Sequence, residues 1–150
     1  MADKIIFITL SVANKMRVVC DLIENEYMNG RRVIVNVADE SEGKSLDQML
    51  WSWKQSSFIP HAFVPELLDQ SDDPVLITDN LYTNLSYDTL ILVSPLPVEK
   101  FDWFHTVIDF AEKYNPTKIV ADRDRFKLYR DKNIILETHN PGEYLHKETA

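Results

Sequence analysis

Apolar residues along the chain follow two patterns, short continuous runs and stripes of helical spacing. The runs are rich in β-branched side chains, which is typical of strands buried on both faces of a sheet, and they occupy residues 4–10, 33–37, 75–78, 89–93 and 134–136. Stripes at i, i+3, i+4 and i+7 predict helices over residues 14–28, 44–53, 101–114 and 116–133. Because strands and helices alternate, we predict the α/β class: a single three-layer α/β/α domain with a mostly parallel sheet and a Rossmann-like topology.

The helix predicted over residues 116–133 is strongly basic, although the chain as a whole is acidic. At about 100° per residue, one face of this helix gathers three cations around apolar side chains; its members are Ile119, Arg123, Phe126, Lys127 and Arg130. The opposite flank, which we expect to face a core, holds Ala121 and Leu128, with Val120 and Tyr129 near them. Three cations around one ring suit a negatively charged ligand that has an apolar end. The alternative is a solvated helix face with local ion pairs, for which Asp122 is available near Lys118.

The helix predicted over residues 44–53 carries a tryptophan outside its apolar stripe. Trp51 lies about a third of a turn from the inner stripe, which consists of Leu46, Met49, Leu50 and Trp53. The turn that follows, residues 56–61, is apolar for a loop and contains Phe58. Trp51 and Phe58 are therefore either ordinary core residues or part of an apolar surface that binds a partner.

Composition narrows the class of protein. A chain of 150 residues with 45% hydrophobic residues is expected to form one domain over residues 1–150, in which residues 140–150 are a polar, frayed tail. The net charge of −8 argues against a general nucleic-acid-binding surface, so a local basic face favours a protein or peptide partner. The single cysteine, Cys20, excludes a disulfide framework and a cysteine-based metal site. Without a run of transmembrane length or a signal-peptide pattern, we expect a soluble cytoplasmic protein that does not bind membranes.

One segment resembles a phosphate-binding loop. Residues 38–45 follow a predicted strand, open a predicted helix and end in Gly43-Lys44-Ser45, as a Walker A motif does. The first glycine of that motif is replaced by Ala38, and the segment contains three carboxylates that would repel a phosphate; these are Asp39, Glu40 and Glu42. Acidic residues here are typical of an ordinary helix start. A small P-loop-like nucleotide-binding enzyme using residues 43–45 is the alternative function.

No other combination of residues predicts catalysis. The three glycines form no GxGxxG turn, and no serine lies in a GxSxG motif. Asp102, His105 and Asp109 would share one face of the helix predicted over residues 101–114; a solvated surface is favoured there over a metal site. The residues therefore favour a binding module that is not an enzyme and needs no cofactor or metal.

Four stretches resemble the chi subunit family of bacterial DNA polymerase III. Residues 20–33 match the family's first helix and second strand, and residues 104–110, FHTVIDF, match another stretch. The most specific stretch is LDQMLW at residues 46–51 followed by SFIPH at residues 57–61. Residues 123–130, RDRFKLYR, resemble the family's RxRYKxYR helix. Phe126 stands where the family has a tyrosine, so any hydrogen bond from that hydroxyl is absent.

The resemblance implies a non-catalytic accessory subunit of the DNA polymerase III holoenzyme, associated with its clamp loader. Chi proteins pair with the psi subunit and bind the acidic C-terminal tail of the single-stranded-DNA-binding protein, so DNA would be contacted only indirectly. Carried over by position, psi binding falls near Trp51 and Phe58, and tail binding falls on Arg123, Phe126, Lys127 and Arg130. The terminal phenylalanine of the tail would pack on Phe126, with its carboxylate within reach of Lys127 and the arginines.

Overall fold

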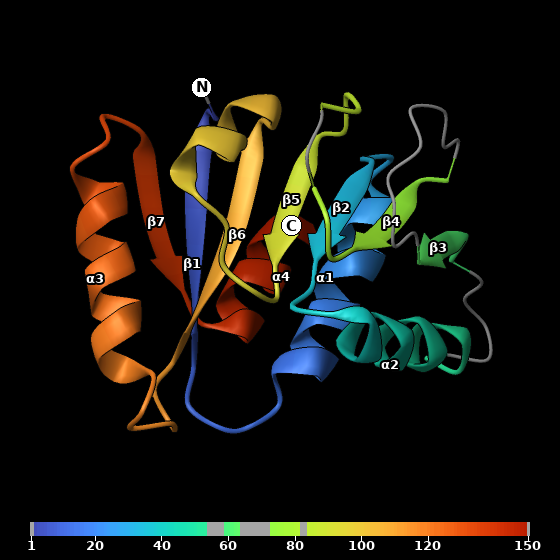
Figure 1. Ribbon diagram of the computed structural model, residues 1–150, viewed down its shortest axis with the longest axis horizontal. Coiled ribbons are helices and arrows are strands. Elements are labelled where there is room, and N and C mark those ends of the chain that lie inside the picture. The colour runs from blue at the N-terminus through green and yellow to red at the C-terminus, as the bar shows by residue number, and fades with distance from the viewer. Residues whose placement is uncertain (1, 54–58, 64–72, 82–83, 150) are drawn as a thin grey trace.

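The computed structural model describes residues 2–53, 59–63, 73–81 and 84–149, and these residues contain a seven-stranded sheet (Figure 1). Its strands are β1 (Lys4–Leu10), β2 (Val33–Asn36), β3 (His61–Phe63), β4 (Val75–Thr78), β5 (Thr89–Leu92), β6 (Thr106–Glu112) and β7 (Ile135–His139). The order across the sheet is β3-β4-β2-β5-β6-β1-β7, and every neighbouring pair is parallel. The predicted α/β class is confirmed.

Within the described residues, helices cover both faces of this sheet. They are α1 (Lys15–Met28), α2 (Glu40–Trp51), α3 (Ile119–Arg130), α4 (Pro141–Thr149) and the 3-10 helix η1 (Val98–Trp103). Side chains of α1, α2 and α4, among them Val19, Leu46 and Tyr144, bury one face. The other face is covered by Tyr129 of α3 and Phe101 of η1. Figure 1 shows α1 and α4 behind the sheet and η1 in front of it, which is the predicted three-layer arrangement. None of the helices in the described ranges is long and apolar enough to cross a bilayer.

The prediction of a helix over residues 101–114 is wrong. This segment contains the end of η1 and the strand β6, which lies between β5 and β1. Val107 packs on the face covered by α3, whereas Ile108 and Phe110 pack on the face covered by α1. A strand buried on both faces is apolar at nearly every position, and such a run also produces a broad helical stripe. The segment forms a strand because it pairs with β5 on one side and β1 on the other. The apolar pattern of the segment alone carries no information about these neighbours.

The residues after Asn140, expected to be a frayed tail, form the helix α4. The Asn140 side chain accepts a hydrogen bond from the Glu143 backbone N–H at 2.8 Å, which caps the helix. Pro141 occupies the first turn, where a missing N–H is tolerated. Tyr144 is 3% exposed and packs into the core. The buried Tyr144 and the partly buried Leu145 therefore anchor a helix that is otherwise polar.

His139, the last residue of β7, contacts Glu143 of α4 and Glu137 of its own strand. Its Nδ1 lies 2.8 Å from Glu143 Oε1, and its Nε2 lies 2.9 Å from Glu137 Oε1. Both nitrogens donate only in the protonated imidazole, so these hydrogen bonds to Glu137 and Glu143 raise the pKa of His139. Because the folded-state pKa exceeds the unfolded one, the stabilisation is complete below about pH 6.5 and is lost as the pH rises through the folded pKa.

We expect His139→Gln to remove this pH dependence. Thermal unfolding of the wild type and the variant should differ most near about pH 6 and converge as the pH rises through the folded-state pKa of His139, above which the wild-type imidazole is neutral. Glu143→Gln, which removes the charge of one partner, should give an intermediate dependence. Melting temperatures of the wild type and His139→Gln that stay equally far apart across this range would contradict the coupling.

Candidate functional site

Helix α3 is held on the sheet by a guanidinium that lies between two carboxylates. Arg125 donates from Nε to Asp109 Oδ2 and from Nη2 to Asp122 Oδ1, both at 2.9 Å. The same Nη2 donates to the Phe110 carbonyl at 3.0 Å, and the Tyr129 hydroxyl donates to Asp109 Oδ2 at 2.6 Å. Asp109 lies in the middle of β6 and is 1% exposed, so these bonds fix α3 against the interior of the sheet.

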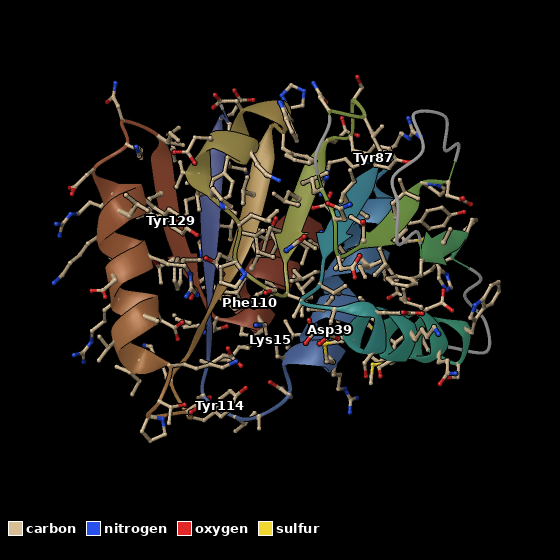
Figure 2. All side chains as sticks on the ribbon, viewed as in Figure 1. Lys15, Asp39, Tyr87, Phe110, Tyr114 and Tyr129 are labelled. Carbon is tan, nitrogen blue, oxygen red and sulfur yellow. The ribbon has the colours of Figure 1, made fainter. Side chains whose placement is uncertain are left out.

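The protonation states of this cluster follow from its surroundings. Burial disfavours the charge on Arg125, but the neighbouring Asp109 and Asp122 outweigh it and raise the pKa of Arg125. Burial and the Asp109 carboxylate also raise the pKa of Tyr129, so its hydroxyl keeps the proton that it donates. Asp122 Oδ2 accepts from the Glu112 backbone N–H at 2.9 Å, so both oxygens of this carboxylate are bonded. Figure 2 labels Tyr129, which lies between α3 and the sheet.

The orientation of α3 differs from the prediction. Val120 and Leu128, expected to face a core, are 66% and 46% exposed, and Ala121 is exposed as well. The positions that face the sheet combine polar and apolar side chains; they are Ile119, Asp122, Arg125, Phe126 and Tyr129. Positions 119, 122, 126 and 129 have the spacing of one helical face. The sequence did not predict this face as the buried one, because a charged residue such as Asp122 is not expected at a buried position. Its ion pair with Arg125 is what makes the position suitable for burial.

A groove of about 530 Å³ lies between α3 and the carboxyl-terminal parts of β1, β6 and β7. Its apolar lining includes Phe7, Ala111, Ile119 and Phe126, and its cationic lining consists of Arg123 and Lys113. The Phe126 ring packs edge-on against the Phe7 ring, with 5.9 Å between centroids and 78° between planes. Arg123 and Lys113 are exposed, and neither forms an ion pair with any residue that the structure describes. The groove thus combines an aromatic floor with two unneutralised cations.

The four residues predicted for peptide binding lie on the side of α3 that borders this groove. Arg123 and Phe126 line it, whereas Lys127 and Arg130 follow on later turns of the helix, outside the lining. Lys127 is exposed and has no ion pair in the described parts of the chain, and Arg130 lies 3.6 Å from Asp131. Lys113 was missed by sequence reasoning, because it belongs to a different element and no periodicity connects it with α3.

Trp51, the last residue of α2, is a surface residue. It is 58% exposed, and its ring lies 4.6 Å from the ring of the buried His61. Leu46 and Leu50 fill the inner stripe of the helix, as predicted, whereas Met49, which was assigned to the same stripe, is 37% exposed. Phe58 lies outside the described residues. Contact with a psi subunit at this surface stays a prediction.

A second cavity, of about 760 Å³, lies at the carboxyl ends of the central strands, where many parallel α/β sheets bind ligands. Glu112 at this edge pairs with two lysines, because its Oε2 lies 3.0 Å from Lys118 Nζ and 3.4 Å from Lys15 Nζ. Burial opposes the charge of Glu112, but hydrogen bonds from Tyr114 and Lys118 outweigh it and lower the pKa of Glu112. Burial also lowers the pKa of Lys15. Figure 2 labels Lys15 and Tyr114 at this edge, where four cations and four carboxylates line the cavity.

The segment that resembles a phosphate loop belongs to α2, which starts at Glu40, so residues 43–45 are helical. Asp39 accepts from the Glu42 backbone N–H at 2.9 Å, and Glu42 Oε1 accepts from the Ala38 backbone N–H at 2.9 Å. Side-chain carboxylates thus occupy amides that a phosphate would need.

Packing accounts for the glycine at position 43, because a Cβ at this position would lie 2.1 Å from the Phe63 ring of β3. Lys44 pairs with Glu40 at 2.8 Å. The loop geometry required by the nucleotide-binding alternative is therefore not formed by residues 38–45.

Asp102, His105 and Asp109 do not share a helical face. Asp102 lies in η1, His105 is exposed with its Nδ1 3.1 Å from Asp3 Oδ2, and Asp109 is buried on β6. The three were grouped only because residues 101–114 were predicted to be one helix.

The family model described as DNA polymerase III chi subunit, HolC, matches residues 2–137. The chain belongs to the DNA polymerase III chi subunit family. Its sequence is 28% identical over 125 residues to DNA polymerase III subunit chi of Pseudomonas aeruginosa, covering 83% of this chain and 85% of that protein. Identity to DNA polymerase III subunit chi of Escherichia coli is 28% over 123 residues, covering 81% and 82%. The region that matches the chi family includes α3 and the groove lining except Thr138, and it ends before α4.

Solved structures outside the chi family share the architecture. The C-terminal domain of Dbp5 from S. cerevisiae, bound to Gle1 and IP6, is 13% identical with a TM-score of 0.58, covering 99% of this chain and 96% of that one. A second structure of the C-terminal domain of the DEAD-box protein Dbp5 is 16% identical with a TM-score of 0.57, covering 99% and 95%. Identity this low shows a common fold alone.

Arg125 and Arg123 provide a matched test of what holds α3 in place. Arg125→Ala should destabilise the protein by about 3–5 kcal/mol, because it leaves the buried Asp109 without its cation. Arg123→Ala, two positions away on the same helix, should change stability by less than about 0.5 kcal/mol, since its side chain is exposed. Urea unfolding followed by circular dichroism measures both. Equal losses in the two variants would contradict the anchoring role of Arg125.

Proposed function

We propose that this member of the chi family is a non-catalytic accessory subunit of the DNA polymerase III holoenzyme in DNA replication, and that α3 and its groove bind the acidic C-terminal tail of the single-stranded-DNA-binding protein. In this role it works in the cytoplasm beside the clamp loader and contacts DNA only through that protein. The observation that carries the proposal is the groove itself: an aromatic floor flanked by cations without ion pairs in the described structure, on a chain whose net charge is −8.

The groove suits a peptide that ends in phenylalanine. Its terminal ring would pack on Phe126 and Ile119, and an aromatic contact of this kind adds about 0.5–1.5 kcal/mol beyond the buried area. Phe126 in place of the family's tyrosine preserves this packing. Lys127 and Arg130, on the exposed later turns, would attract aspartates upstream of the terminal residue and thereby increase the association rate and its salt dependence.

A peptide with several aspartates that ends in Pro-Phe with a free carboxylate should bind the wild type in calorimetry. Lys127→Glu should abolish binding, because the reversed charge repels an acidic peptide, and amidation of the peptide C-terminus should weaken it strongly. Lys132→Glu is the matched control, since Lys132 carries the same charge but follows the end of α3 and is not on its basic face. Normal binding by Lys127→Glu would reduce the basic face to a solvated surface, and equal binding of the amide would exclude capture of the carboxylate.

We further propose that the exposed Trp51 binds the psi subunit, with Phe58 as its predicted neighbour. Trp51→Ala should weaken psi binding by at least about 2 kcal/mol, as truncated aromatic anchors commonly do, while tail-peptide binding persists. Met28→Ala, at another exposed apolar residue, is the control. Titration of psi by calorimetry measures the loss, and unchanged psi binding by Trp51→Ala would contradict the assignment.

A further inference from the structure

Lys113 belongs to the groove although it lies outside α3. It directly follows β6, and its backbone N–H donates to the Leu10 carbonyl at 2.9 Å, so its main chain is fixed at the end of β1. Its side chain lines the groove together with Arg123 of α3. Lys113 is exposed and, among the residues that the structure describes, it has no ion-pair partner. Two elements thus contribute one free cation each to the same groove.

The charges around the groove are unevenly distributed. Arg123 and Lys113 are the cations in its lining, whereas Lys127 lies outside it on a later turn of α3. The carboxylate in the lining, Asp122, is 7% exposed, and its two oxygens accept from Arg125 and from a backbone N–H. Its negative charge is therefore compensated by Arg125. An anionic group inside the groove meets two positive charges that nothing else in the described structure neutralises.

This distribution gives a bound peptide a direction. When a terminal phenylalanine packs its ring on Phe126, its α-carboxylate lies only a few bonds from the ring and stays within the groove. We propose that Lys113 and Arg123 form a clamp for the terminal carboxylate, and that the peptide leaves the groove toward Lys127 and Arg130, which meet its aspartates. Lys113 is then a specificity-determining residue that distinguishes a free C-terminus from an internal segment. This inference rests on the proposed binding of the acidic tail.

Calorimetry with two peptides, the C-terminal acid and its amide, tests the clamp. Lys113→Gln should weaken the acid peptide about tenfold and the amide less than about twofold, because a charge-assisted hydrogen bond is lost only with the acid. Lys113→Arg should restore the preference for the acid. Lys132→Gln, the same charge change outside the groove, should leave the acid-to-amide ratio unchanged. Lys127→Gln should weaken both peptides by the same factor, since both carry the upstream aspartates.

The outcomes separate the clamp from the function on which it rests. If the acid peptide does not bind the wild type, the proposed tail binding is overturned. If it binds, and Lys113→Gln weakens acid and amide equally or neither of them, the clamp is wrong and tail binding stands. If Lys127→Gln, rather than Lys113→Gln, abolishes the preference for the acid, the carboxylate lies at the other end and the direction of the peptide is reversed.

Discussion

The contact of Arg125 with Asp109 and Asp122 determines how α3 sits on the sheet. Asp109 belongs to β6 and Asp122 to α3 itself, so a rotation of the helix about its axis would break the bonds to the strand. A buried carboxylate that loses its cation costs about 3–5 kcal/mol, which is a large part of the stability of a small domain. With the rotation fixed, Arg123 and Phe126 border the groove, and Val120 and Leu128 point outward. The orientation of the proposed binding face thus depends on an ion pair buried beneath it.

Most of the sheet could be predicted from the sequence, because its strands are short β-branched runs separated by turn residues. The strand at residues 4–10 and the helix that follows it are examples. Prediction failed for β6, where burial on both faces produced a stripe as broad as that of a helix. It also failed for α4, which is anchored by two neighbouring residues, Tyr144 and Leu145. In both cases the deciding contacts join residues far apart in the sequence, and local periodicity does not report them.

In the candidate site, too, the residues of one helix could be predicted and their contacts with other elements could not. Arg123, Phe126, Lys127 and Arg130 could be placed on one face because they share a helix, and helical spacing alone groups them. Which other residues they face could not be predicted. That depends on the Arg125–Asp109 pair, whose members are on different elements, and a buried aspartate contradicts the usual rule for inner positions. Lys113 could not be predicted for a related reason. It directly follows β6, and its place beside α3 depends on how that helix packs on the sheet, not on its neighbours in the chain.

The carboxyl end of β6 separates two environments of opposite electrostatic character. In open parallel sheets ligands usually bind at this edge. Here Glu112 pairs with Lys15 and Lys118, and the lining of the cavity as a whole holds four carboxylates against four cations. Successive side chains of a strand point to opposite faces. Lys113, the next residue, therefore lies in the groove on the other face, where no carboxylate neutralises it among the described residues. Two adjacent residues thus give one cavity that satisfies its own charges and one groove that still attracts an anion, and this favours the α3 face over the usual ligand edge of the fold.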